Sequence, residues 1–226
     1  MRKLKVLEMI DRPSLGGGQV HVLSLAKSLE REKFDVSVCS RGGGPLVDEL
    51  RKLDIPHAAL PVFKRPSLRA RREMAGILKR GNFDILHTHG GVAGFHGRPA
   101  GRSAGTPVIV HTLHGIHYLH YGSALLRRAS VLLERRFSRF TDCVVCVSER
   151  DLHNATEFKL APPEKLKLVQ NGIDVSGLVR PFDPAAKKAE LGLDPCRPLD
   201  GTVARLHRQK GLASLIRASR KIGEHV

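Results

Sequence analysis

Short apolar runs rich in β-branched residues alternate with helical patterns along most of the chain, and this alternation constrains the fold most. The runs expected to form strands are LKVLEMI (4–10), FDVSVCS (34–40), FDILHTH (83–89), PVIVHTL (107–113) and DCVVCVS (142–148), with weaker candidates at 57–62 and 166–170. Helical patterns lie between them, at 17–32, 68–80, 91–104, 123–139 and 149–158. Nearly continuous apolar strands separated by helices are typical of a parallel sheet that is covered on both faces. The sequence therefore predicts a doubly wound, Rossmann-like α/β domain whose ligands bind at the carboxyl ends of the strands.

The alternation stops near residues 172–182, where we expect a domain boundary. Asn171 and Gly172 form a turn signal, and prolines between 181 and 195 bracket one short helical pattern. One further strand, DGTVARL (200–206), and one helix follow it. A single strand and helix cannot bury a core. The expected domains are therefore 1–177, a complete Rossmann-like domain, and 178–226, a linker with the start of an incomplete second one.

The charge of the chain points to an anionic partner. Its 38 Lys and Arg residues against 22 Asp and Glu residues give a formal net charge of +16, which suits nucleic acid, a membrane surface or a phosphorylated substrate. Arginine is dense at 64–72 and at 127–139, and the second segment has an amphipathic helical pattern. These arginine-rich helices would suit an anionic membrane surface, and a merely solvated basic surface fits the pattern almost as well. Nucleic acid is disfavoured, because only Tyr118 and Tyr121 offer a stacking platform and no recognised binding module is present.

Three consecutive glycines, 16–18, follow the first predicted strand and open an amphipathic helix. Residues without side chains let backbone N–H groups approach an anion, and the amino end of a helix favours negative charge. The spacing differs from the dinucleotide-binding pattern G-x-G-x-x-G. A second cationic pair, Arg205 and Lys210, lies across a predicted strand-to-helix turn and suits a diphosphate, although the spacing alone fits solvated surface cations better.

The segment HTLHGIHYLH (111–120) has a histidine at every third position. Residues three apart share one face of a helix, so four imidazoles there would suit zinc. The strand predicted at 107–113 argues against this arrangement. It places His111 inside a strand, His114 at its carboxyl end, and His117 and His120 in the loop or turn beyond. We therefore expect no metal site in this segment.

Six segments occur in an order that resembles glycosyltransferase family 4 over essentially the whole chain: LGGGQVHVLSLAKSL, FDILHTHG, PVIVHTLHG, CVVCVSE, LVQNGID and GTVARLHRQKG. The resemblance implies the GT-B architecture, in which two Rossmann-like domains face each other across a cleft. It implies retaining transfer of a sugar from a nucleotide-sugar donor to a glycan or lipid-linked acceptor, without a metal or another cofactor. Polysaccharide or lipopolysaccharide biosynthesis is the implied setting, in the cytoplasm or peripherally at the inner face of the membrane.

The resemblance also assigns roles to residues of this chain. Gly16 and Gly17 would approach the diphosphate of the donor, and Arg205 and Lys210 would hold it and offset the charge that develops on the leaving group. The histidine of the T-x-H-G turn, His114, would be the catalytic residue at the reaction centre. Further candidates on the acceptor side are His21, His87, His89 and His117.

One family signature is missing from its expected place. Members carry two glutamates eight positions apart in the C-terminal domain, whereas Glu149 and Glu157, which have that spacing here, lie in the N-terminal part. We interpret this spacing as a coincidence on a surface helix, so the chain is expected to be truncated and inactive alone. The alternative is a non-catalytic remnant or binding module that retains affinity for an acceptor or a membrane. A nucleic-acid-binding α/β protein is the weakest hypothesis.

Overall fold

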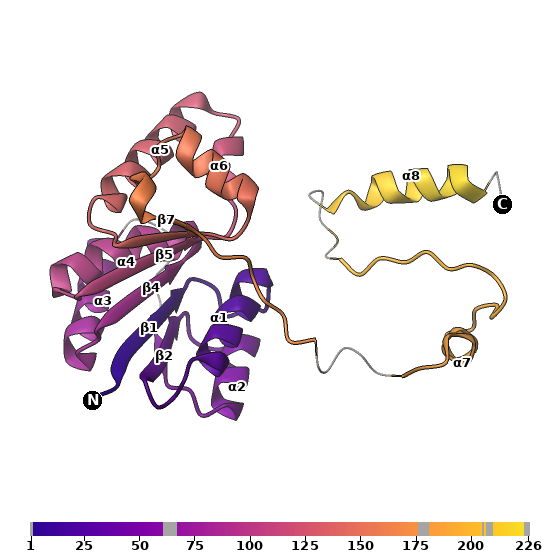
Figure 1. Ribbon diagram of the computed structural model, residues 1–226, viewed down its shortest axis with the longest axis horizontal. Coiled ribbons are helices and arrows are strands. Elements are labelled where there is room, and N and C mark those ends of the chain that lie inside the picture. The colour runs from indigo at the N-terminus through magenta and orange to yellow at the C-terminus, as the bar shows by residue number, and fades with distance from the viewer. Residues whose placement is uncertain (1, 61–66, 176–180, 205, 207–209, 224–226) are drawn as a thin grey trace. The chain divides into compact units, whose positions relative to one another are not determined.

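A computed structural model of the chain describes residues 2–60, 67–175, 181–204, 206 and 210–223 (Figure 1). The chain divides into two units, Met1–Ile173 and Asp174–Val226, each of which is described by itself below. The assignment of residues 1–177 and 178–226 to two Rossmann-like domains stays a prediction.

The first unit is built on one seven-stranded sheet in which every neighbouring pair of strands is parallel. The order across the sheet is β3-β2-β1-β4-β5-β6-β7. The strands are β1 (Leu4–Ile10), β2 (Phe34–Ser40), β3 (His57–Ala59), β4 (Ile85–His89), β5 (Val108–Leu113), β6 (Cys143–Cys146) and β7 (Leu166–Leu168). This arrangement confirms the Rossmann-like α/β fold predicted from the alternating pattern, including the two weaker strand candidates.

Helices connect the strands and cover both faces of the sheet. They are α1 (Gly17–Ser28), α2 (Pro45–Lys52), α3 (Leu68–Gly81), α4 (Gly90–Ala104), α5 (Ala124–Ser138) and α6 (Glu149–Glu157), with short 3-10 turns η1 (His117–His120) and η2 (Pro163–Lys165). The sequence analysis missed α2, which has only eight residues and follows three glycines. Pro45 at its start and three buried side chains, Leu46, Val47 and Leu50, were the available signals.

Alternate side chains of β1 show how the two faces are covered. Leu7 and Met9 are buried together with residues of α3 and α4, whereas Ile10 is buried with residues of α1 and α2. Neighbouring positions on a strand point to opposite faces of a sheet. Helices α3 and α4 therefore cover one face, and α1 and α2 cover the other, as a doubly wound fold requires.

Helix α4 lies unusually close to the sheet because it carries glycines where it crosses the strands. A Cβ atom on Gly97 would lie 2.6 Å from Sδ of Met9 and from Cγ2 of Thr88, and one on Gly94 would lie 2.5 Å from Cε1 of His111. Such contacts leave no room for any side chain at the two positions. Gly94 and Gly97 of α4 are thus explained by packing rather than by ligand binding.

A buried ion pair connects α4 to α5. The guanidinium of Arg98 donates two hydrogen bonds to the carboxylate of Glu134, at 2.6 and 2.8 Å, and its Nε donates to the carbonyl oxygen of Gly94. Both charged residues are buried, and the ring of Phe137 lies 5.1 Å from the Arg98 guanidinium carbon. Two-point geometry compensates part of the cost of removing both charges from water.

The second unit contains α7 (Pro184–Glu190) and α8 (Leu212–Gly223). The strand predicted at 200–206 is wrong for the part that is described, since residues 200–204 form no regular secondary structure and Val203 is fully exposed. A strand needs a neighbour to pair its backbone N–H and C=O groups, and the described residues of this unit offer no other strand. Arg205 lies outside the described residues.

The Arg98–Glu134 pair allows a direct test of how the helices are held. Glu134→Leu should lower the free energy of unfolding by about 3–5 kcal/mol, because Arg98 stays buried without its carboxylate. The double variant Arg98→Met/Glu134→Leu should recover most of that loss, because no charge then remains buried. Urea denaturation of the two variants measures both effects.

A matched control is available on the surface. Glu73→Ala removes the exposed pair between Arg69 and Glu73 on α3 and should cost less than about 1 kcal/mol. Equal losses in the single and double variants at Arg98 and Glu134 would show that packing, rather than an unpaired charge, causes the loss.

Candidate functional site

The strand order reverses direction between β1 and β4, and the candidate site lies at this point. The chain leaves β1 to form α1 on one face of the sheet, and it leaves β4 to form α4 on the other. A crevice opens at the carboxyl ends of two strands where their connections separate in this way. The last residues of the two strands, Ile10 and His89, are register partners, so both lie beside this point.

Strand alternation determines which polar side chains share one face of the sheet at this point. Glu8 pairs with His87 in the register of β1 and β4, and His89 lies two positions further along β4 on the same face. His111 belongs to the opposite face, where its Nδ1 lies 2.8 Å from Oγ1 of Thr88 and its ring lies against Gly94 of α4. The repeat at 111–120 therefore forms no cage around one metal ion, and His111 is a buried strand residue.

A buried carboxylate lies at the base of the site. Oε2 of Glu8 is 2.6 Å from Nε2 of His89 and 3.0 Å from Nδ1 of His87, whose Nε2 is 2.8 Å from Oγ1 of Thr112. Burial raises the pKa of the Glu8 carboxyl, but the charge and hydrogen bonds of the two histidines outweigh it and leave this pKa well below its ordinary value. Glu8 is therefore ionised although it is only 2% exposed.

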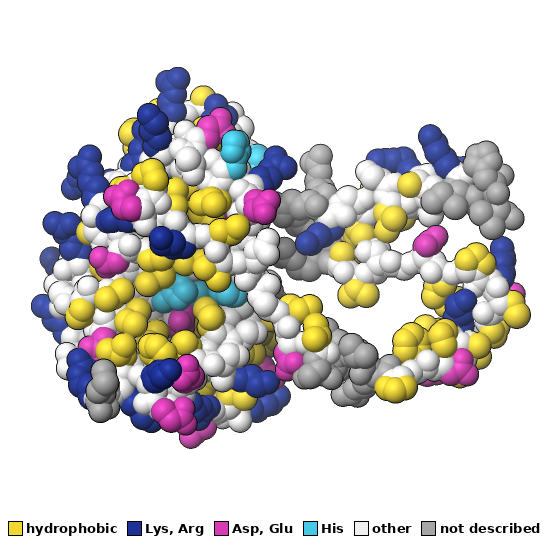
Figure 2. Space-filling view, in the orientation of Figure 1, with side chains coloured by type: hydrophobic (Ala, Val, Ile, Leu, Met, Phe, Trp, Pro, Cys, Tyr) yellow, Lys and Arg dark blue, Asp and Glu magenta, His cyan; other side chains and the backbone are white. Residues whose placement is uncertain are grey.

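Three histidines extend from this carboxylate toward the start of α1. Nδ1 of His89 lies 3.1 Å from Nε2 of His114, and the ring of His21 meets both rings edge-on, with centroids 5.6 Å from His89 and 5.1 Å from His114. Figure 2 shows histidine side chains gathered among apolar ones. We call His21, His87, His89 and His114 the histidine cluster.

Burial keeps the inner part of the histidine cluster neutral. It lowers the pKa of His89 to about 3, with a further lowering by His87, and it lowers the pKa of His114 to about 4, with a further lowering by His21. The pKa of His21 is also lowered by burial. Neutral imidazoles offer one hydrogen-bond donor and one acceptor each, so the cluster can position hydroxyl groups.

The glycine triplet brings the start of α1 against the cluster. A Cβ atom on Gly18 would lie 3.4 Å from Cδ1 of Ile10 and 3.7 Å from Cδ2 of His114. Gly17, by contrast, is exposed and would place a Cβ atom in open space, and Gly16 precedes the helix with an extended backbone. A Cβ atom on Gly18 would thus make only ordinary contacts with Ile10 and His114, and the space beside Gly17 stays open at the amino end of the helix.

The other predicted site residues are on η1 or in the second unit. His117 and His120 are exposed on η1, outside the histidine cluster. Lys210 is exposed in the second unit, and Arg205 is outside the described residues. The predicted pairing of Gly16 and Gly17 with Arg205 and Lys210 around a diphosphate therefore stays a prediction.

The sequence analysis missed Glu8. A glutamate in the otherwise apolar run LKVLEMI was the available signal, because a carboxylate in a buried strand is costly unless it has partners. His87 and His89, two positions apart on a second buried strand, were those partners.

Two groups of residues in the described part of the chain have the composition of a metal site. The potential ligand atoms of His21, His89 and His114 lie within 4.8 Å of one another, and so do those of Glu8, His87 and His89. Both groups depend on His89, whose two ring nitrogens already lie within hydrogen-bonding distance of Glu8 and His114. The ligand sets are chemically reasonable for zinc, so the expectation of metal-free chemistry needs its own experiment.

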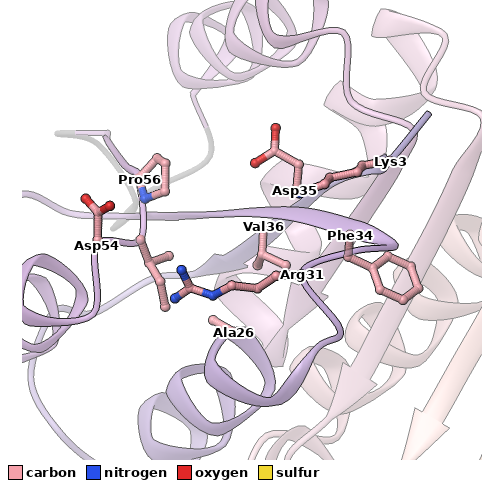
Figure 3. A pocket seen from close by; sticks show the side chains of 9 residues that line it. Lys3, Ala26, Arg31, Phe34, Asp35, Val36, Asp54 and Pro56 are labelled. Carbon is pink, nitrogen blue, oxygen red and sulfur yellow. The ribbon is translucent and has the colours of Figure 1, made fainter. Parts of the chain in front are cut away.

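A small pocket of about 170 Å³ lies away from this site (Figure 3). Its lining comes from the amino ends of β1 and β2, from α1 and the loop after it, and from the segment that precedes β3: Lys3, Ala26, Arg31, Phe34, Asp35, Val36, Asp54, Ile55 and Pro56. Ligands of doubly wound sheets bind at the opposite, carboxyl ends of the strands. We therefore do not assign the pocket to the functional site.

None of the described helices is both long enough and apolar enough to span a bilayer.

Known proteins resemble the chain in sequence. It is 28% identical over 193 residues to the UDP-Gal:alpha-D-GlcNAc-diphosphoundecaprenol alpha-1,3-galactosyltransferase of Escherichia coli, covering 84% of this chain and 49% of that protein. It is 30% identical over 224 residues to the alpha-maltose-1-phosphate synthase of Mycolicibacterium smegmatis, covering 93% of this chain and 55% of that protein. The chain thus spans about half the length of these curated relatives.

Solved structures share the fold. The sucrose-phosphate synthase of Thermosynechococcus elongatus matches with a TM-score of 0.72 at 16% identity, over 97% of this chain and 60% of that one. The Anabaena HepE protein, solved in complex with UDP and glucose, matches with a TM-score of 0.67 at 21% identity, over 84% of this chain and 50% of that one. At these identities the likeness concerns the fold alone, and it agrees with the Rossmann-like sheet of GT-B glycosyltransferases.

The family model for Glycosyltransferase Family 4 matches residues 15–176. This span runs from the glycine triplet through β7 and contains all four residues of the histidine cluster. Since this match covers well over half of the chain, the protein belongs to glycosyltransferase family 4.

Proposed function

We propose that the chain forms the acceptor-side part of a glycosyltransferase that takes its sugar from a nucleotide-sugar donor. The observation that carries this proposal is the position of His114 beside the glycine triplet, at the point of the family-matched sheet where ligands bind. The E. coli relative is named for transfer from UDP-Gal, and the Anabaena structure contains UDP and glucose. Both support a uridine diphosphate sugar as the donor class.

The residues of the site suit binding of a sugar diphosphate without a metal ion. The backbone N–H groups at the start of α1, where Gly17 leaves open space, would approach the diphosphate. His114, neutral and partly exposed, would position the donor sugar or assist the movement of charge as the leaving group departs. Arg205 and Lys210 would complete the charge compensation, and the transfer would retain the configuration of the sugar.

A lipid-linked acceptor would bring the protein to a membrane surface, and α5 has the chemistry for such a contact. Leu125 and Leu132 are 76% and 62% exposed, and Arg128 and Arg136 on the same helix are also exposed. Arginines beside exposed leucines are typical of helices that lie on anionic bilayers. We therefore propose peripheral attachment through α5, with the E. coli relative's diphosphoundecaprenol substrate as supporting precedent.

The role of His114 can be tested by transfer assays with UDP-sugars, on the protein expressed with any sequence that follows residue 226 in its reading frame. His114→Ala should reduce turnover by about two orders of magnitude or more, the loss expected when a positioned polar group is removed from a reaction centre. Folding should change little, because His114 lies just beyond the end of β5 rather than in the core. His120→Ala is the matched control and should cost much less.

Chelation decides whether the histidine cluster acts through a metal. EDTA should leave transfer largely intact. In the separate test of the variant, full turnover of His114→Ala would contradict the proposed role of His114. Loss of transfer with EDTA, followed by recovery with zinc, would make the cluster a metal site.

Membrane attachment predicts a charge-dependent binding that maps to α5. The protein should sediment with anionic but not with neutral liposomes, and added salt should release it. Arg128→Gln/Arg136→Gln should weaken binding about fivefold for each arginine. The control Lys33→Gln/Lys52→Gln removes the same charge from exposed lysines on other elements. Equal weakening by both double variants would show that net charge, rather than α5, drives binding.

A further inference from the structure

A continuous chain of hydrogen bonds runs from Glu8 through His89 to His114, with donor–acceptor distances of 2.6 and 3.1 Å. We propose that Glu8 and His89 are positioning residues that hold His114 in the tautomer with its proton on Nε2, so that Nδ1 is the acceptor presented to a sugar hydroxyl. The last step of this inference rests on the proposed function, whereas the tautomer itself does not.

The ionised carboxylate of Glu8 determines which atom donates in each of these hydrogen bonds. An ionised carboxylate accepts hydrogen bonds and cannot donate one. Its oxygen Oε2 is 2.6 Å from Nε2 of His89, so the proton between them must belong to that nitrogen. His87 holds the carboxylate in place from the other side, because its Nδ1 donates to Glu8 while its Nε2 contacts the hydroxyl of Thr112.

The position of the single proton on His89 then determines which atom donates in its hydrogen bond with His114. Burial lowers the pKa of His89 to about 3, so at neutral pH the ring carries a single proton, the one directed at Glu8. Its Nδ1 is then a bare lone pair. Nε2 of His114 lies 3.1 Å away and must supply the proton of this hydrogen bond.

His114 is left with a defined acceptor. The ring is neutral because burial lowers its pKa to about 4, and its one proton is engaged with His89, so Nδ1 carries a lone pair. Gly18 packs against the Cγ–Cδ2 edge of the ring. His114 is only partly buried and its hydrogen bond to His89 uses Nε2, so we place the donating sugar hydroxyl at Nδ1.

Nitrogen-15 NMR of the histidine side chains tests the tautomer directly, because protonated and unprotonated ring nitrogens have well-separated shifts. In the unmodified protein, His89 and His114 should both show a protonated Nε2 and an unprotonated Nδ1, and His87 should show a protonated Nδ1. A proton on Nδ1 of His114 would overturn the inference. Two unprotonated nitrogens between His89 and His114, with bound zinc, would overturn it in favour of a metal site.

The variant Glu8→Met removes the acceptor while keeping similar side-chain volume. His114 should then lose its single Nε2–H pattern and show a mixture of tautomers. The internal control is His57 of β3, whose side chain hydrogen-bonds to that of Ser40 in β2. Both strands lie on the side of β1 away from β4, so the nitrogen-15 shifts of His57 should not change. An unchanged His114 in a folded Glu8→Met protein would overturn the inference, and the spectrum of the unmodified protein decides the point even if the variant fails to fold.

Transfer kinetics then test the positioning role. Glu8→Met should lower kcat by about two orders of magnitude or more, with a smaller change in the KM for the donor, because a catalytic imidazole in the wrong tautomer cannot perform its function. A mixture of tautomers with unchanged kcat would overturn the role. Absence of transfer in the unmodified protein would count against the proposed function, while the NMR result would stand by itself.

Discussion

Parallel pairing of the strands is the constraint on which the site depends. Because all strands of the sheet run in one direction, their carboxyl ends meet at one edge, and the register sets Ile10 beside His89 and His89 beside Thr112. Residues about 80 positions apart in the chain, such as Glu8 and His89, thereby come within a single hydrogen bond. A slip of one position would turn the side chains of a strand to the opposite face and separate them.

The buried carboxylate gives the site its rigidity and also limits its chemistry. An isolated charge in the core costs several kcal/mol, and the hydrogen bonds from His87 and His89 offset that cost only while both rings hold their positions. The cluster is therefore preorganised, with the neutral rings of His89 and His114 held above one negative charge. Since that charge does not favour an anionic ligand, a diphosphate bound as proposed would need compensation from other groups, such as the backbone N–H groups at the start of α1.

The sequence was sufficient for the fold of the first unit, because strand and helix patterns there agree with the final packing. It failed for α2, a short helix after glycines, and for residues 200–204 of the predicted second-unit strand, because an apolar run becomes a strand only when a partner is available.

The site was partly predictable. Placing residues 107–113 on a strand was enough to separate His111 from His114. The link from His114 to Glu8 was not predictable, since it depends on a register between distant strands. That Glu8, His87 and His89 share the face covered by α1 also became visible only with the strands paired.

The T-x-H-G turn has a physical explanation in this structure. Thr112 still belongs to β5, and the alternation of the strand directs its hydroxyl to His87. Leu113 points to the other side and is buried in the core. At His114 the strand has ended, so its ring is oriented by the hydrogen bond that it donates to His89 rather than by the alternation of the strand. Gly115 then adopts a φ of 86°, a backbone conformation that side chains disfavour, which turns the chain away and leaves the imidazole at the edge of the sheet.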